Sequence, residues 1–325
     1  MKVQKLSDLA IEVGMINDPR GSEEIQRCLV NRRNKYDHLE ASERELFDLK
    51  TLDHPYDDSR ILHLADDEDI GLILVSIDGD RRVLNTAKHM GIGICWSHHP
   101  HGALTGLPTV MEIQKAVMLA AGMTDGVIDK LMAPRVEEVL RKVLPVDMED
   151  SIAAARQLGI TLLATHTPAD NCVHTFLQKV LEKAKPRTLG DLLKILLEFP
   201  EYRHAAKIRQ GCQIIVGKNS HTVGNFILMM TGGTEGPVEI YQHLVNAGIS
   251  TAIGMHFSEE HVKAAKEAGI NLIIAGHTCS DIIGMNLLMN AIERRTGEEL
   301  LIAPGFLRVR RDEGFDDLKG NIISQ

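Results

Sequence analysis

Two patterns of apolar and polar positions alternate along this chain. From about residue 67, short apolar runs alternate with longer segments in which apolar residues recur every three or four positions. The short runs predict buried strands, and the longer segments predict amphipathic helices. The predicted strands cover residues 71–77, 91–96, 159–165, 213–216, 225–230, 250–255 and 270–275. Apolar strands that alternate with helices are typical of parallel sheets covered on both faces, so we expect an α/β fold.

The same pattern divides the chain into three segments. Residues 1–66 show helical spacing of apolar residues and predict an N-terminal helical extension with a structural or oligomer-forming role. Residues 67–200 predict a first α/β lobe, which contains a His-His-Pro motif. Residues 201–325 predict a second α/β lobe, whose last strand and helix could return to the first. Both lobes are expected to have mostly parallel sheets covered by helices.

Composition excludes several classes of protein. The chain has 325 residues and a formal net charge of −9, which argues against nucleic acid as a partner because nucleic-acid-binding domains are usually basic. No apolar run approaches the ~18 residues of a membrane helix, and the first residues do not resemble a signal peptide. The five cysteines are scattered and never in CxxC spacing, which predicts free thiols and a cytoplasmic protein without a membrane partner.

Histidines follow four of the predicted strands. They are His98 and His99, His166, His256 and His277. Open α/β sheets bind ligands beyond the carboxyl ends of their strands, so these imidazoles are expected at the functional edge. A proline after the His98-His99 pair favours a turn there, which would let both imidazoles reach one site.

Two carboxylates accompany these histidines. Asp281 follows His277 by four residues at the start of a predicted helix, a spacing that places both side chains on one helix face. Asp170 follows His166 at the same spacing, although Pro168 predicts that the helix begins between them. Histidine and carboxylate ligands suit zinc, iron or manganese. Five or six such ligands, with one bridging carboxylate, favour two divalent ions over one. His166 and His256 are the weaker ligand candidates.

Each of these signals also has a structural interpretation. The His98-His99-Pro100 segment could be an ordinary polar turn. Asp170 could cap the start of a helix, and Asp281 could complement a helix dipole. The glycine-rich segment 231–237 could bind phosphate, but it fits neither standard glycine motif, which favours a tight turn.

Three motifs together resemble a known family. They are Ser97-His98-His99-Pro100, His166-Thr167-Pro168-Ala169-Asp170 and Gly276-His277-Thr278-Cys279-Ser280-Asp281. With the Thr231-Gly232-Gly233 turn, they resemble the NGG-interacting-factor-three-like (Nif-three-like) family, whose bacterial members are often labelled GTP cyclohydrolase I type two homologues. The resemblance runs in order from about residue 67 to 305 and does not clearly cover the N-terminal helices.

The resemblance implies a metal site and an assembly. It implies two divalent cations in a toroidal homohexamer whose metal sites face the interior. The ligands that it nominates are His98, His99, Asp170, His277 and Asp281. The family usually has glutamate at the position of Asp281, so the carboxylate expected to bridge the ions is one methylene shorter here.

The leading functional hypothesis is metal-dependent hydrolysis of a nucleotide or a related small molecule. The substrate rests on the family label alone, and the sequence identifies no catalytic residue. The alternative is a non-catalytic protein that forms a ring and has a metal-handling or a regulatory role. A third interpretation is a scaffold for protein partners, which would need an exposed apolar patch away from the histidines.

Overall fold

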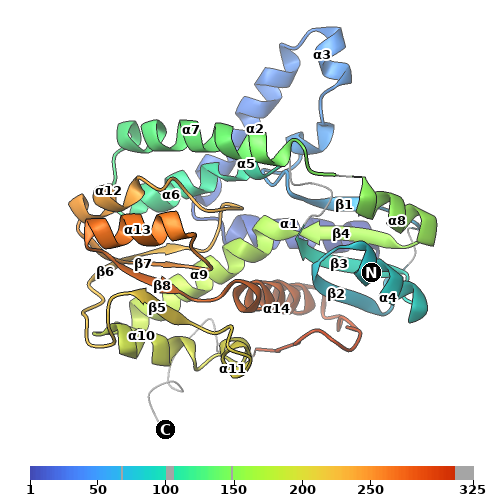
Figure 1. The fold of residues 1–325 in the computed structure, drawn as a ribbon. Helices are drawn as coiled ribbons and strands as arrows, with labels where there is room; N and C mark the ends of the chain where they lie inside the picture. Colours follow the sequence, from blue (N-terminus) through green and yellow to red (C-terminus); the bar gives the residue numbers. More distant parts are fainter. Residues whose placement is uncertain (67–68, 100–105, 148, 312–325) are drawn as a thin grey trace.

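The computed structural model describes residues 1–66, 69–99, 106–147 and 149–311 (Figure 1). Two four-stranded sheets lie side by side, each covered by helices, which confirms the predicted α/β fold with two lobes. Pro100, which was expected to turn the chain after His99, lies outside the described residues. Within the described residues, no helix is long and apolar enough to cross a membrane.

The first sheet has the order β1-β4-β3-β2. Its strands are β1 (Ser59–His63), β2 (Ile73–Asp78), β3 (Ile94–His99) and β4 (Thr161–Thr165). β2, β3 and β4 are parallel, and β1 pairs antiparallel with β4 at the edge. No strand was predicted before residue 67, so β1 lies inside the segment expected to be a helical extension. β1 was missed because its polar residues interrupt the apolar pattern.

The second sheet repeats this arrangement with the order β5-β8-β7-β6. Its strands are β5 (Gln213–Val216), β6 (Asn225–Met229), β7 (Ile249–Gly254) and β8 (Asn271–Ile274). β6, β7 and β8 are parallel, and β5 is the antiparallel edge strand. In both sheets the first strand lies beside the fourth, followed by the third and the second. The chain is therefore built from two halves of the same topology.

Helices α9 (His166–Ala184) and α14 (His277–Thr296) follow the last strand of each half and pack against each other. They lie between the two sheets (Figure 1). Apolar residues of α9 and α14 contact the first sheet together with α1 (Val3–Ile16). Other residues of the same two helices contact the second sheet together with α10 (Leu189–Leu196) and α11 (Pro200–Lys207). α14, from the second half, thus packs on both lobes.

The outer faces of the sheets are covered by the remaining helices. α4 (Arg81–His89) and α8 (Asp150–Leu158) cover the first sheet. The helices over the second sheet are α6 (Glu112–Ala120), α7 (Asp125–Val143), α12 (Ile240–Asn246) and α13 (Glu259–Ala268). Short α5 (Leu107–Val110) precedes α6. α2 (Gly21–Asp37) and α3 (Ala41–Glu45) project from the body, and the 3-10 helix η1 (Leu49–Leu52) leads back to it (Figure 1).

One glycine sets the distance between α9 and α14. A Cβ atom at Gly284 would lie 2.5 Å from the carbonyl oxygen of Ala169, a separation that real Cβ atoms essentially never show. Only glycine therefore allows the two backbones to approach this closely. Ala169 precedes Asp170, and Gly284 is three residues after Asp281, so this contact helps to bring the two aspartates together.

Candidate metal centre

Each half of the chain contributes the same short motif at the same place in its topology. After β4, α9 begins with His166-Thr167 and carries Asp170 one turn later. After β8, α14 begins with His277-Thr278 and carries Asp281 one turn later. The repeated pattern is therefore His-Thr-x-x-Asp at the start of the helix that follows the last parallel strand. Because α9 and α14 pack together, the two motifs meet.

β3 adds two neighbouring imidazoles to this place. His98 is fully buried, whereas the side chain of His99 is 25% exposed, and their ring centroids are 4.8 Å apart. The sequence indicated that the strand ends before these histidines, but β3 continues through His99. Successive side chains on a strand point in different directions. Even so, His98, His99 and His166 each offer a ring nitrogen, and these three nitrogens lie within 4.8 Å of one another.

His98 belongs to a first group of possible ligands with His166 and both aspartates. The His98 Nε2 atom lies 3.5 Å from Asp170 Oδ1 and 3.6 Å from Asp281 Oδ1. The His166 Nε2 atom lies 3.6 Å from Asp170 Oδ2. These donors converge from β3, α9 and α14.

His99 and His277 form a second group around the other oxygen of Asp281. The Asp281 Oδ2 atom lies 3.8 Å from the Nε2 atoms of both His99 and His277. Since Oδ1 of the same carboxylate faces His98, Asp281 lies between the two groups with one oxygen toward each. The five residues that the sequence nominated most strongly are thus close together in space, and His166 joins them.

His256 occupies a more peripheral position. Its ring centroid lies 4.7 Å from that of His277 in an edge-to-face arrangement, and it lines the adjoining pocket. In the described part of the chain, it belongs to none of the groups of three or more side chains whose ligand atoms lie within 4.8 Å of one another.

The cluster has an unusual number of buried polar atoms without partners. In the described residues, both ring nitrogens of His98, Oδ1 of Asp170 and both oxygens of Asp281 are buried and accept or donate no hydrogen bond. Each such atom costs about 1–3 kcal/mol. Their separations are too long for hydrogen bonds. They are close to the roughly 3.4 Å that separates two ligands of a tetrahedral ion with bonds of about 2.1 Å. The donor set therefore fits divalent cations.

The shifted pKa values of the cluster residues also fit a site for a positively charged ion. Burial, with the added charge of Asp170, raises the pKa of Asp281 well above its usual range. Burial raises the pKa of Asp170 to about 7. Burial and the neighbouring imidazoles lower the pKa of His98, and they lower the pKa of His277 to about 4. A cation would stabilise the charged carboxylates and use the neutral imidazoles of His98 and His277 as ligands.

Two further aspartates orient the histidines, and sequence reasoning missed both. Asp58 Oδ2 lies 2.7 Å from His166 Nδ1, and Asp78 Oδ1 lies 2.7 Å from His99 Nδ1. In both cases the carboxylate engages Nδ1 and leaves Nε2 facing the cluster, which is the usual arrangement behind a metal ligand. Asp78 pairs in register with His99 at the ends of β2 and β3, so an aspartate at the end of the neighbouring strand was the available signal.

The Asp58 carboxylate is held firmly. It accepts hydrogen bonds of 2.7 Å from Thr167 Oγ1 and 2.8 Å from Ser59 Oγ. Burial opposes the ionised form of Asp58, but the hydrogen bond and charge of His166 outweigh burial and lower the pKa of Asp58. Burial likewise opposes a charged His166, but the surrounding carboxylates, Asp170 first, raise the pKa of His166 to about 9.

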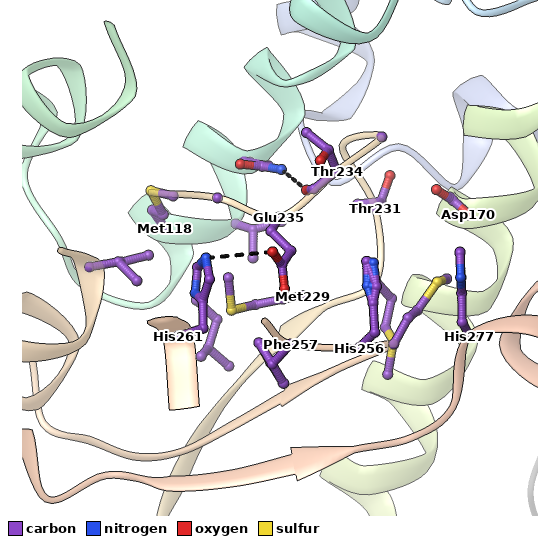
Figure 2. A pocket seen from close by; sticks show the side chains of 18 of the residues that line it. Met118, Asp170, Met229, Thr231, Thr234, Glu235, His256, Phe257, His261 and His277 are labelled. Carbon is purple, nitrogen blue, oxygen red and sulfur yellow. Dashed lines mark hydrogen bonds and ion pairs between the residues drawn. The ribbon is translucent and has the colours of Figure 1, made fainter. Parts of the chain in front are cut away.

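A pocket with a cavity volume of about 70 Å³ adjoins the cluster. His166, Asp170 and His277 line one end of it. Figure 2 shows Asp170 and His277 on one side of the pocket and Glu235 and His261 on the other, with apolar side chains between them. Three of the possible ligands are therefore accessible from a pocket that can hold water or another small molecule.

Comparison with known proteins identifies the fold. No family model matches the chain, and no curated protein matches it. The NIF3 superfamily protein from Sphaerobacter thermophilus matches with a TM-score of 0.71 and 19% identity, over 94% of this chain and 98% of that one. Reduced HcgD from Methanocaldococcus jannaschii matches with a TM-score of 0.47 and 12% identity, over 76% and 89%. A NIF3-related protein from Bacillus cereus matches with a TM-score of 0.40 and 10% identity, over 79% and 92%.

The first of these matches covers nearly the whole of both chains. The chain therefore has the fold of a NIF3 superfamily protein, and the resemblance inferred from its motifs is confirmed at the level of the fold. The match also extends over the N-terminal part, which the motifs did not clearly cover.

Proposed function

We propose that the histidine and aspartate cluster binds two divalent cations and that the protein is a metal-dependent hydrolase of a small molecule. The observation that carries the proposal is the Asp281 carboxylate. Both of its oxygens are buried without a hydrogen-bond partner in the described residues, and Oδ1 faces His98 whereas Oδ2 faces His99 and His277. This is the arrangement expected of a carboxylate that bridges two ions.

The two groups of side chains define which residues would hold each ion. His98, His166, Asp170 and Asp281 would hold the first. His99, His277 and Asp281 would hold the second. Bound divalent cations would supply Lewis acidity, lowering the pKa of water and polarising the scissile bond. Histidine and carboxylate donors suit zinc, iron or manganese.

The protein's own groups would orient the ligands and admit the substrate. Asp58 and Asp78 would fix the ring orientations and the tautomers of His166 and His99. The side chain of His277 is 45% exposed, and His277 also lines the pocket, so a molecule from solvent could approach this end of the cluster. That access favours hydrolysis over a purely structural or storage role for the ions, which would need no adjoining pocket.

The test is a panel of hydrolase substrates, including nucleotides and uncharged amides, with chelated and metal-reloaded protein. We expect reloaded protein to hydrolyse at least one compound and chelated protein to hydrolyse none. His204→Ala, a substitution on the exposed surface of α11, should behave like the wild type, whereas His98→Ala should be inactive. Metal-loaded protein that binds two ions but hydrolyses nothing would favour the alternative of a non-catalytic metal-handling or regulatory protein.

A further inference from the structure

The pocket beside the metal cluster has a second polar group at its other end, formed by Glu235 and His261 (Figure 2). Glu235 Oε1 accepts a 2.6 Å hydrogen bond from the backbone N–H of Ser258, which fixes the carboxylate. Its Oε2 atom lies 3.9 Å from His261 Nε2, beyond hydrogen-bond distance. The two groups therefore lie side by side at the pocket without satisfying each other.

The hydrogen bond between His261 and Tyr241 is compatible with a proton on Nε2 of His261. The His261 side chain is 2% exposed, and burial lowers its pKa, so the ring is neutral and has one donor and one acceptor. Its Nδ1 atom lies 3.0 Å from the hydroxyl oxygen of Tyr241. Tyr241 can donate to Nδ1, and a proton on Nε2 suits the neighbouring carboxylate. The pair then presents an acceptor, Glu235 Oε2, beside a donor, His261 Nε2–H.

Gln114 adds an independent sign of a missing ligand. Its Nε2 atom donates hydrogen bonds to the carbonyl oxygens of Thr234, at 2.6 Å, and Gly232, at 3.3 Å, which fixes the orientation of the amide. The Gln114 side chain lines the same pocket, and its Oε1 atom is buried without a partner in the described residues. A buried acceptor without a partner is costly, so a ligand N–H would be stabilised there.

The lining of the pocket selects against anionic ligands, and much of it is apolar. Met229 and Phe257 lie between the two ends (Figure 2), and Met118 and Met255 also line the pocket. None of the described residues that line the pocket is lysine or arginine, and Glu235 would repel an anion. The cavity volume of about 70 Å³ suits a small ligand.

We propose that this end of the pocket binds an uncharged amide group, as found in a lactam ring or an open amide. The amide N–H would donate to Glu235 Oε2, and the neighbouring carbonyl would accept from His261 Nε2–H. Gln114 Oε1 would accept a further N–H where the compound has one. If this ligand is the substrate, the inference rests on the proposed hydrolase function. The protein would then recognise the uncharged N–H and C=O edge of an amide, and a phosphate would not bind at this end of the pocket.

The test is calorimetric titration of the full chain, chelated and metal-loaded, with three probes of similar size. 2-Pyridone has N–H beside C=O, 1-methyl-2-pyridone lacks the N–H, and benzoate is an anion. We expect 2-pyridone to bind at least tenfold more tightly than the other two, in both metal states. Glu235→Gln should weaken 2-pyridone binding about tenfold. Glu267→Gln, the same change of charge on the exposed surface of α13, should leave it unchanged.

The results separate this inference from the proposed function. If 2-pyridone binds no more tightly than 1-methyl-2-pyridone or benzoate, or if Glu235→Gln has no effect, the assignment of the amide site is overturned. Metal content is measured on the same samples. Selective 2-pyridone binding by protein that takes up no metal would support the amide site and reject the proposed metal-dependent hydrolysis.

Discussion

The orientation of two histidines in the cluster depends on Asp58 and Asp78, which are not ligand candidates themselves. Each carboxylate engages Nδ1 of a histidine and leaves Nε2 facing the place where an ion would bind. Asp58 is the more constrained of the two, because it is fully buried and accepts hydrogen bonds from two hydroxyl groups as well.

We therefore predict that Asp58→Asn weakens metal binding by about 10- to 100-fold, although Asp58 contributes no ligand atom. The asparagine keeps the size of the side chain but loses the charge that orients His166. Affinity is measured by competition with a chelator of known strength. Asp53→Asn on the exposed surface nearby is the matched control and should have wild-type affinity. Equal affinity in the two variants would contradict a role for Asp58 in orienting His166.

His174 makes a prediction about stability and pH. Its side chain is buried, Nδ1 has no partner in the described residues, and burial lowers its pKa to about 4. Its pKa in the unfolded chain is about 6.5. The neutral ring therefore contributes its full stability above pH 6.5, and this stability is lost as the pH falls from 6.5 toward 4.

For chelated protein, we expect the wild-type free energy of unfolding to fall more steeply than that of His174→Gln between pH 6.5 and pH 4. The difference in slope should approach about 1.4 kcal/mol per pH unit, the value for one proton. Urea unfolding at several pH values measures it. Parallel slopes for the two proteins would show that His174 does not titrate as the burial predicts.

At the residue scale, the sequence could predict the ligand candidates but not their support. The histidines and their partner aspartates are recognisable because they lie at or just after the ends of apolar strands. The role of Asp78 could be inferred only from the strand register, which places it opposite His99. Asp58 was hidden because it precedes β1, a strand whose mixed polar and apolar residues gave no pattern.

At the scale of elements, the pair formed by α9 and α14 builds the cluster. The two helices carry the repeated His-Thr-x-x-Asp motif, and the close contact between Gly284 and Ala169 sets their separation. The sequence predicted both helices, but it could not predict that they pack together, because the contact joins residues more than one hundred positions apart.

Gly284→Ala should destabilise the protein by about 1–3 kcal/mol, because the added Cβ overpacks the helix contact. It should also weaken metal binding, because Asp170 and Asp281 would move apart. Gly126→Ala in α7 is the control, since its Cβ would meet nothing within 4 Å. That control should be neutral or more stable by up to about 1 kcal/mol. Chemical unfolding and metal titration measure the two effects, and a neutral Gly284→Ala would refute the helix-contact argument.

At the scale of the whole molecule, the two halves share one strand order, and the cluster lies where they meet. This explains why residues from His98 to Asp281 are needed together. The α/β class and most strands could be predicted from the apolar pattern. The presence of two halves with the same topology could not be predicted, because the equivalent segments share one short motif but little other sequence.

We also propose that the chain assembles as a homohexamer and that the projecting segment α2–η1 takes part. Val30, Leu46 and Leu49 of this segment are 54%, 88% and 56% exposed, so the segment offers apolar side chains to a partner copy. Light scattering should give a mass of about six times the 35.9 kDa chain. Leu46→Glu should lower that mass, whereas Ile208→Glu, at another exposed apolar position, should not. A monomeric wild-type chain would contradict the proposal.

Binding of two ions is tested most directly by the number of metal ions per chain, measured by elemental analysis after loading and removal of free metal. We expect two ions for the wild type and for Asp129→Ala, an exposed control. We expect far less than two for Asp281→Ala, because both groups lose the shared carboxylate. Wild-type protein that retains no metal, or an Asp281→Ala variant that still retains two ions, would show that the cluster does not bind two ions through Asp281.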